Sequence, residues 1–335
     1  MVTADRLARA RAKDSDAFQE LTEPHYRELK VHCYRMLGSI QDAEDALQDT
    51  LLSAWRGIES FEGRSSIRTW LYRIATNRCL NVLRADRRAA KEWDISAIEP
   101  PEPTGYDDVV WLEPFPDTLL EGAMNAPLGP EARYEQNEAI SLAFITALQV
   151  LPPRQRAVLI LREVLGYRAA EVAEMLDSTV ASVNSALKRA RTGLAHRLDS
   201  DRNAEPPPAR DSPTERALVE RFVRAYEAGD VDALVTLLTA DVRLSMPPIP
   251  LLWRGRDVVG QFFAAVFSPG PAYDLVPTRA NGQQAYGVYL RAPSGGIRHG
   301  AGMLVLDLSG GRISALTRFE NTVLPHFGLP WSLPS

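Results

Sequence analysis

The sequence predicts a multidomain protein: two all-α helical domains, the second a helix-turn-helix, followed by an α+β domain. Apolar residues recur at helical spacing in residues 3–84 and again in residues 139–198. After residue 270 the pattern changes to short strand-like runs separated by turns that contain Gly or Pro. We therefore expect a first helical domain, an acidic Pro-rich linker, a second helical domain, a Pro-rich spacer and an α+β domain, at residues 1–91, 92–138, 139–203, 204–213 and 214–335.

The charge of the whole chain hides a local basic stripe. The 335 residues carry a formal net charge of −5, which does not by itself indicate a nucleic-acid-binding protein. Between residues 68 and 91, however, seven Arg and Lys residues face a single acid, Asp86. A stripe of this kind is more informative than the total charge, because nucleic acid contacts only one face of a protein.

Composition excludes several classes of protein. The two cysteines, Cys33 and Cys79, stand in helical, mostly apolar segments, so we expect buried free thiols and neither a metal site nor a cofactor. No run approaches the ~20 apolar residues that cross a membrane. The N-terminus lacks the apolar stretch of a signal peptide. We expect a cytoplasmic protein.

The first helical domain is organised around residues 41–84. Residues 3–37 precede this stretch as helix, interrupted near Pro24, and Gly38 is suited to end them. Residues 41–84 predict a helix, a short loop and a second helix that Ser65 or Ser66 caps. The first helix presents a strip of carboxylates, whereas the second presents Trp, Arg and Asn. These residues alone leave open a basic protein partner, a nucleic acid, or an ordinary helical hairpin with solvated charge.

The linker is strongly acidic. Residues 92–138 contain twelve acidic residues and one basic residue, and seven prolines deny them long helices. Composition favours a flexible, solvated connector. Four large apolar residues within it predict a short anchored segment instead: Trp111, Leu112, Phe115 and Leu119.

The second helical domain has the pattern of a helix-turn-helix. Pro152 and Pro153 break the chain, Gly166 ends the next helix, and a polar turn at 177–179 separates helices at 167–176 and 180–198. The last helix carries Ser, Asn, Lys and Arg on one face, which suits contacts to bases and phosphates. The residues alone fit a plain helical hairpin with a basic surface equally well.

Two long stretches resemble a known family. DAEDALQDTLLSAW and FEGRSSIRTWLYRIATNRCLNVLR resemble region 2 of the extracytoplasmic-function sigma factors. LPPRQRAVLILREVLGYRAAEVAEMLDSTVASVNSALKRAR resembles region 4 of the same family. One departure is Asp177, where the family usually has glycine; aspartate tolerates the left-handed turn better than most residues.

The resemblance implies partners and site residues. Core RNA polymerase would be contacted through its β′ coiled coil and its β flap, and promoter DNA through two elements. The residues implied for the β′ coiled coil are Asp42, Glu44, Asp45, Gln48 and Asp49. Those implied for the melted −10 element are Ser60, Phe61, Glu62, Gly63, Arg64, Ser65, Ser66, Trp70, Arg73, Asn77, Arg78 and Asn81. Those implied for the −35 duplex are Ser182, Asn184, Ser185, Lys188, Arg189 and Arg191.

The C-terminal domain changes character. Helices are expected at 214–228, 231–238 and 258–267, then strands at 273–279, 285–291, 300–308 and 312–319. EAGDVDALVTLLTADVRLSMPP and WRGRDVV resemble the SnoaL-like domains, which implies an α+β cone whose apolar mouth can hold a small ligand. The residues considered for such a mouth are Arg243, Trp253, Tyr286, His299, Arg318 and Glu320.

Taken together, these features predict a sigma factor that initiates transcription, performs no chemistry of its own and is regulated by its fused cone. We expect the cone, or the tail at 327–334, to pack on region 2 or on the connector. Two alternatives stay open. One is a small-ligand enzyme of the isomerase or hydrolase type with a helical regulatory part; the other is a DNA-binding regulator that acts without polymerase.

Overall fold

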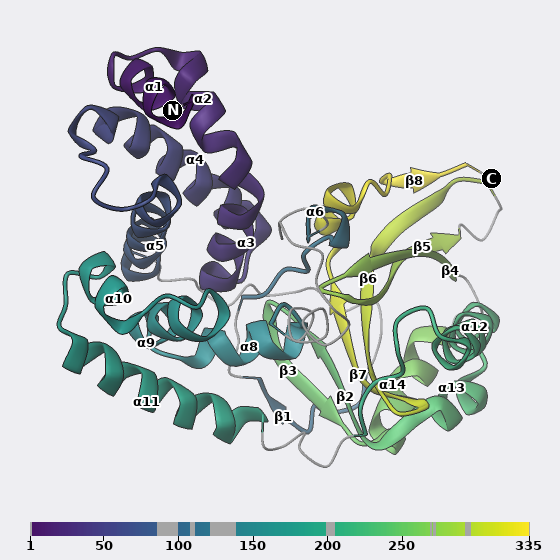
Figure 1. Cartoon of the computed structure of the whole chain (residues 1–335). Coiled ribbons are helices and arrows are strands. Elements are labelled where there is room, and N and C mark those ends of the chain that lie inside the picture. The colour runs from purple at the N-terminus through teal and green to yellow at the C-terminus, as the bar shows by residue number, and fades with distance from the viewer. Residues whose placement is uncertain are drawn as a thin grey trace. The chain divides into compact units, whose positions relative to one another are not determined.

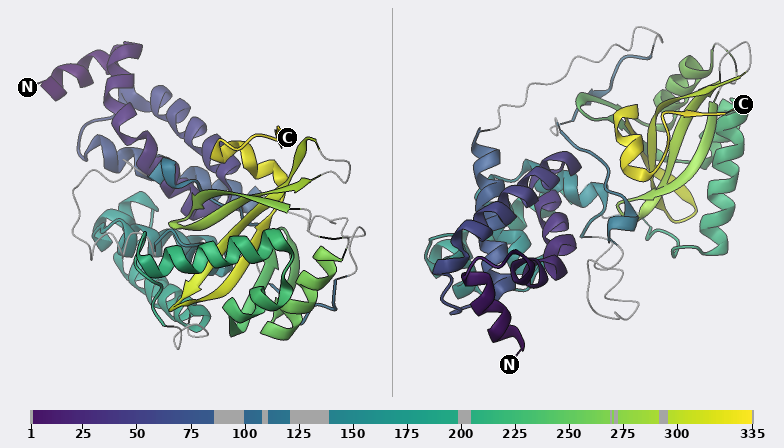
Figure 2. Two further views of the ribbon diagram at one scale, coloured as in Figure 1. Left: turned by 90° about the vertical axis from the view of Figure 1, so that its right-hand side faces the viewer. Right: turned by 90° about the horizontal axis from the view of Figure 1, so that it is seen from above.

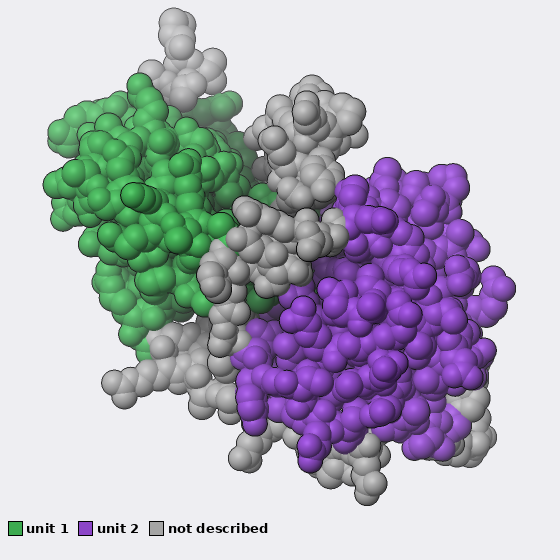
Figure 3. Space-filling model, turned by 90° about the horizontal axis from the view of Figure 1, so that it is seen from below, with its two compact units in different colours: residues 1–87, 118–200 green, residues 88–117, 201–335 purple. Residues whose placement is uncertain are grey.

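The computed structural model describes residues 2–85, 100–107, 111–120, 139–198, 205–268, 270, 273–291 and 296–334. The chain forms two compact units, coloured separately in Figure 3. Unit 1 comprises residues 1–87 and 118–200, and unit 2 comprises residues 88–117 and 201–335. The predicted linker is thus divided between the units, and its described residues up to Asp117 belong to unit 2. No helix in the described ranges is both long and apolar enough to cross a membrane.

The first half of unit 1 is helical (Figure 1). The expected interruption near Pro24 is confirmed as a 3-10 turn. Gly38, at φ 75°, ends the helix that follows this turn. A further break was not expected: Lys13 adopts a left-handed φ of 64°, and Asp14 caps the next helix. Ser66 caps the last helix by accepting the N–H of Thr69 at 3.0 Å. The elements are α1 (Val2–Arg11), α2 (Ser15–Thr22), η1 (Glu23–His25), α3 (Tyr26–Leu37), α4 (Ile40–Gly57), η2 (Ile58–Ser60) and α5 (Ile67–Ala85).

Helix α3 forms the centre of this half. Its residues from 31 to 37 are all buried, and α4 and α5 pack against it. Cys33 on α3 and Cys79 on α5 are buried free thiols, as expected. Burying an apolar face in this way is what stabilises helices of this length in water.

The second half of unit 1 contains the predicted helix-turn-helix. Asp177 takes the left-handed conformation, with φ 47°, so the turn survives the absence of glycine. Val183, Leu187 and Ala190 are buried on the inner face of the last helix. The elements are α8 (Leu142–Val150), α9 (Pro153–Leu159), the π-helical turn η3 (Ile160–Val164), α10 (Ala169–Met175) and α11 (Val180–Leu198).

Unit 2 is the predicted α+β domain. Its strands run in the order β1-β3-β2-β7-β6-β5-β4, and β8 pairs with β6. The four expected strands are present as β4 to β7. The helices are α12 (Pro213–Ala228), α13 (Val231–Leu237), α14 (Arg256–Phe267) and the 3-10 helix η5 (Asn321–Phe327). The strands are β1 (Gly105–Tyr106), β2 (Leu238–Met246), β3 (Ile249–Arg254), β4 (Tyr273–Ala280), β5 (Gln283–Arg291), β6 (Arg298–Ser309), β7 (Arg312–Phe319) and β8 (Ser332–Leu333).

The sheet carries α12, α13 and α14 on one face and η5 on the other (Figure 2). Large apolar side chains from these three helices and from the strands form one core, which includes Phe222, Phe263 and Leu304. Strands β2 and β3 were not expected, because the run MPPIP, which spans the end of β2 and the start of β3, has the composition of a loop. Pro247 and Pro248 occupy the connection between these two strands, whereas Pro250 lies within β3.

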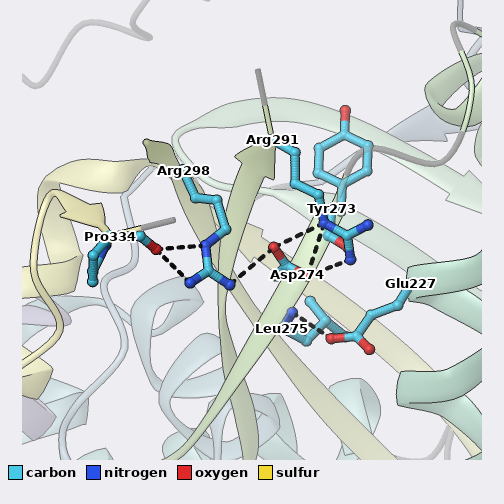
Figure 4. Close-up of polar contacts among 7 residues, drawn as sticks. All are labelled: Glu227, Tyr273, Asp274, Leu275, Arg291, Arg298 and Pro334. Carbon is cyan, nitrogen blue, oxygen red and sulfur yellow. Dashed lines mark hydrogen bonds and ion pairs between the residues drawn. The ribbon is translucent and has the colours of Figure 1, made fainter. Parts of the chain in front are cut away.

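The C-terminal tail is bound to its own sheet. Arg298 donates from Nε to the carbonyl of Pro334 at 3.1 Å, and Asp274 links Arg298 to Arg291 (Figure 4). Tyr289 donates its hydroxyl to the carbonyl of Pro330 at 2.8 Å. The described tail thus pairs with the sheet of its own domain.

Candidate nucleic-acid interface

The acidic strip lies on α4. Ser39 caps this helix by accepting the N–H of Asp42 at 3.1 Å, and the residues that face the core are small or apolar. Asp45, Gln48 and Asp49 are exposed, whereas Glu44 is ion-paired with Lys30 of α3 at 2.5 Å. Asp45, Gln48 and Asp49 are therefore the exposed members of the predicted polymerase-binding set. A basic protein surface could pair with these carboxylates.

The loop between α4 and α5 has two buried residues, Ile58 and Phe61. Phe61 is 8% exposed, and its ring centroid lies 4.8 Å from that of Trp70. Gly63 takes a left-handed φ of 75°, which turns the chain back toward α5. Glu62 and Arg64 pair at 3.0 Å on the outside, so the rim of the loop is polar around an aromatic floor.

The predicted DNA-facing side of α5 is partly occupied. Arg73, Asn77 and Asn81 are exposed, but the amide of Asn77 donates to the carbonyl of Met175 in α10 at 3.2 Å. Arg78 donates to Ser53 Oγ at 2.7 Å and so ties α5 to α4. Asn77, one of the predicted −10 residues, therefore lies at the joint between the two helical halves of unit 1.

Arg68 is the centre of that joint. Its Nε lies 3.1 and 2.9 Å from the two carboxylate oxygens of Glu28. Its guanidinium lies 4.8 Å from the ring of Tyr72 and 5.8 Å from that of Tyr167, which belongs to the other half. Sequence analysis missed this cluster, since residues 28, 68 and 167 share no local pattern.

The electrostatics of the joint favour a charged Glu28. Burial acts to raise the pKa of this carboxyl, but hydrogen bonds from His25, at 2.6 Å, and from Arg68 outweigh it. The pKa of Glu28 is therefore lowered, and the carboxylate is ionised at neutral pH.

Two buried arginines also cross the joint. Arg35 donates to the carbonyl of Ala139 at 2.9 Å, and burial lowers its pKa to about 10. Arg156 is 4% exposed and donates to the carbonyls of Met36 and Gln149. Arg35 of the first half thus bonds to the second half. Arg156 of the second half bonds both to Met36 of the first half and to Gln149 of its own half.

The outer face of α11 is basic and exposed. Thr179 Oγ1 caps the helix by accepting the N–H of Ser182 at 3.1 Å. Arg191 is paired with Glu163 at 2.8 Å, and both side chains remain well exposed. The other predicted −35 residues are all exposed: Ser182, Asn184, Ser185, Lys188 and Arg189.

The described connector is built into the cone. Gly105 and Tyr106 form β1 and pair with Leu252 and Leu251 of β3. Thr104 donates its N–H to the carbonyl of Leu252 at 2.9 Å. These backbone bonds make the connector an edge strand of the sheet, which composition alone did not predict.

The expected anchored segment in the connector is confirmed. Phe115 is fully buried, and it exchanges hydrogen bonds with Asn281: its N–H donates to Oδ1 at 2.7 Å, and its carbonyl accepts the N–H of Asn281 at 2.8 Å. Asp117 accepts the N–H of Gly282 at 2.7 Å and lies 3.4 Å from Arg279. Burial raises the pKa of Asp117, although Gly282 and Arg279 partly offset this effect. Three other acidic residues of the linker are described, Glu102, Asp107 and Glu113, and the remaining ones lie outside the described residues.

The residues considered for a cone mouth lie on several elements, and two of them, Tyr286 and Arg318, flank Leu304 in one row across β5, β6 and β7. Trp253 and Tyr286 are buried in the apolar core, and Trp253 Nε1 donates to the carbonyl of Pro101 in the connector at 2.9 Å. His299 is exposed on β6, where it pairs with Ser332 of the tail. Arg318 donates to the carbonyl of Ala301 at 2.8 Å. Arg243 lies on β2, and Glu320 precedes η5.

Three family descriptions match the chain. Residues 21–89 match Sigma-70 region 2, residues 141–194 match Sigma-70 region 4, and residues 219–316 match the SnoaL-like domain. These ranges coincide with the helical hairpin, the helix-turn-helix and most of the cone.

Curated relatives match either nearly the whole chain or little more than half of it. The ECF RNA polymerase sigma factor SigG of Mycobacterium tuberculosis is 42% identical over 325 residues, which cover 94% of this chain and 85% of that protein. RNA polymerase sigma factor YlaC of Bacillus subtilis is 31% identical over 193 residues, covering 58% of this chain and 98% of that one. The crystal structure of the M. tuberculosis extracytoplasmic function sigma factor SigJ matches the fold with a TM-score of 0.60 and 22% identity, covering 93% and 99% of the two chains.

Proposed function

Since this chain belongs to the extracytoplasmic-function RNA polymerase sigma factors, we propose that its exposed charged faces carry out the two halves of promoter recognition. The acidic strip of α4 docks on the β′ coiled coil of core polymerase. The second helical half meets the β flap and reads the −35 duplex through α11. The observation that carries the proposal is this separation of charge, with carboxylates exposed on α4 and cations exposed on α11.

The −10 element is read as single strand. The loop at 57–66 has a polar rim around Phe61 and Trp70, which suits a base extruded from the duplex. Extrusion costs a few kcal/mol, and aromatic contacts repay part of that cost. Arg73, Asn77 and Asn81 contact the same strand, so the bond from Asn77 to Met175 opens when the two halves of unit 1 separate on polymerase.

The fused cone regulates initiation by holding the connector. Backbone pairing at β1 and the exchange of bonds between Phe115 and Asn281 support this role. A connector that is bound to the cone is not free to contact polymerase or DNA. The strength of this binding therefore controls how readily the two helical halves engage a promoter. His299, one of the residues considered for a ligand-converting cone, is exposed on β6 and pairs with Ser332 of the tail, which favours the regulatory role.

Charge reversal tests the docking surface. The double variant Asp45→Lys and Asp49→Lys should weaken binding to core RNA polymerase by about tenfold or more, because like charges then meet at the interface. A matched double reversal at exposed acids of unit 2, Asp232→Lys with Asp241→Lys, should leave binding unchanged. Equal binding by wild type and the α4 variant in a direct titration would reject this docking surface.

Transcription in vitro tests the whole proposal. The purified chain together with core RNA polymerase should initiate transcription specifically on a promoter selected from genomic DNA. The chain alone should bind that DNA less tightly than the complex does. Specific DNA binding without polymerase would favour the polymerase-independent regulator. Turnover of a small ligand that is lost in His299→Ala and Glu320→Ala variants would favour the enzyme.

A further inference from the structure

We propose that the end of α1 is a positioning element for the −10 loop: Arg11 and Lys13 hold residues 57–66 in the shape that receives the extruded base. This inference rests on the proposed function and deepens it. Neither residue belongs to the set that the family resemblance assigns to promoter DNA, and both lie before the matched range of Sigma-70 region 2, which begins at residue 21.

Arg11 contacts the backbone of the loop directly. Its Nη2 donates to the carbonyl of Phe61, fifty residues away in sequence, and the side chain is partly buried. The ring of Phe61 packs on Trp70, so this one residue is fixed both by its ring and by its carbonyl. A hydrogen bond from a charged donor is among the stronger kinds available to a carbonyl.

Lys13 contacts the last turn of α4 and Glu59 of the loop. Its amine donates to the carbonyl of Trp55 at 2.9 Å, pairs with Glu59 at 3.2 Å and lies 5.2 Å from the centroid of the Trp55 ring. The left-handed φ of 64° at Lys13 is uncommon for a residue with a side chain. This conformation closes α1, because the N–H of Lys13 donates to the carbonyl of Ala10 at 3.0 Å and the N–H of Asp14 donates to that of Arg9 at 3.1 Å. The turn thus directs the Lys13 side chain to the end of α4 and to Glu59.

The loop needs such support because it has little regular structure of its own. Residues 61–66 are neither helix nor strand, and Arg64 and Ser65 are exposed. A pocket that discriminates among bases must hold its groups within a fraction of an ångström, and loops do this less well than helices unless a second set of contacts fixes them. Arg11 and Lys13 supply contacts of that kind from a rigid helix end.

Two variants remove these contacts with little cost to folding. Arg11→Ala deletes the bond to Phe61, and Lys13→Gly deletes the amine while it favours the left-handed backbone. Arg6→Ala is the matched control, because it removes the same charge from α1 and only a surface ion pair with Glu20 at 2.8 Å. Each full-length variant is assembled with core RNA polymerase and mixed with fork DNA that carries a randomised single-stranded overhang; the retained DNA is then sequenced.

The expected result is specific to one position of the overhang. Wild type and Arg6→Ala should prefer one base there, and Arg11→Ala and Lys13→Gly should lose about tenfold of that preference, about 1.4 kcal/mol. Affinity for core RNA polymerase, thermal midpoint and preferences at the other positions should stay as in wild type. That combination would not follow from a general loss of stability.

Three results would overturn the inference. Retained preference in both variants would show that the loop keeps its shape without α1. Weaker retention of all overhangs alike would identify the two cations as simple phosphate contacts. Loss of preference only together with a lowered thermal midpoint in both variants would identify a structural role. If wild type itself shows no base preference with polymerase, the proposed function fails instead, which is a separate outcome.

Discussion

Each unit joins segments that are far apart in the sequence, but the two joints use different bonds. In unit 1 the helical halves meet through long side chains: Arg68 between two tyrosines, Asn77 on Met175, and Arg156 on Met36. In unit 2 the connector meets the cone through backbone pairing at β1 and through Asn281.

The difference concerns what each joint can do. Side-chain bonds between preformed helices can break one at a time and leave both halves folded, which suits the separation of the halves that the proposed function requires. Backbone pairing ties the connector to the sheet, so its release exposes unpaired N–H and C=O groups along β3 as well. We therefore expect unit 1 to open readily and unit 2 to release the connector only at a higher cost.

The largest effect is expected at Arg156. Arg156→Met keeps much of the side-chain volume but leaves buried carbonyls without a donor, each at about 1–3 kcal/mol. We expect unit 1 to lose about 3 kcal/mol or more, measured by chemical unfolding. Arg154→Met, two residues away, removes one bond from an exposed side chain to the carbonyl of Leu176 and should cost under about 1 kcal/mol. Equal losses in the two variants would contradict the role given to the buried guanidinium.

The next largest effect is expected from pH, which should change the stability of unit 1 through His32. His32 is fully buried, donates or accepts at Thr76 Oγ1 at 2.9 Å, and has a pKa lowered to about 3 by burial and by the nearby Arg35. Between pH 6.5 and 3 the unfolded chain therefore binds this proton and the folded chain does not, so stability falls as pH falls. From pH 7 to pH 5 the loss should be about 2 kcal/mol.

A variant isolates this histidine from the other titrating groups. His32→Gln should flatten the dependence of the unfolding free energy on pH between 7 and 5, whereas His326→Gln, at an exposed position in η5, should not. Glu28, whose pKa is lowered, stays ionised in both the folded chain and the unfolded chain over most of this range. An unchanged slope in His32→Gln would mean that other groups carry the acid response.

A smaller effect is expected at the connector joint. Asn281 has a left-handed φ of 56°, so Asn281→Gly keeps the backbone and removes only the amide that accepts from Phe115. We expect unit 2 to lose about 1–2 kcal/mol, since the buried N–H of Phe115 is left without that acceptor. Proteases should then cut the connector faster than in wild type. The amount of promoter-directed transcription in vitro should also differ from that of wild type. Asn321→Gly, which removes an exposed bond to Gly300, serves as the control.

Helices and strands with clear periodicity could be predicted from sequence, and joints could not. The ends of α3 and α5 and the left-handed turn at Asp177 follow from capping residues and from local backbone preference. Strands β2 and β3 were missed because Pro247 and Pro248 between them and Pro250 within β3 carry a loop signal. Strand β1 was missed because two residues are too few to show a period.

The candidate site divides in the same way. The exposed faces of α4 and α11 follow from helical spacing, so residues such as Asp49 and Lys188 could be placed from sequence. The contacts of Arg11 with Phe61 and of Glu28 with Arg68 join residues forty or more positions apart. No local pattern encodes contacts of that kind, since they depend on how the helices pack.

The smallest effect on stability, and a distinct effect on DNA, is expected at Arg191. Its pair with Glu163 spans 2.8 Å between exposed side chains, and such pairs contribute about 0–1 kcal/mol. Arg191→Ala should therefore leave unfolding nearly unchanged. If Arg191 leaves Glu163 to meet a phosphate, the variant should lower the slope of binding against salt concentration by about one and weaken all sequences alike. Glu163→Gln should strengthen binding instead, because it releases the guanidinium. An unaltered salt slope in both variants would show that Arg191 stays paired with Glu163 and contacts no phosphate.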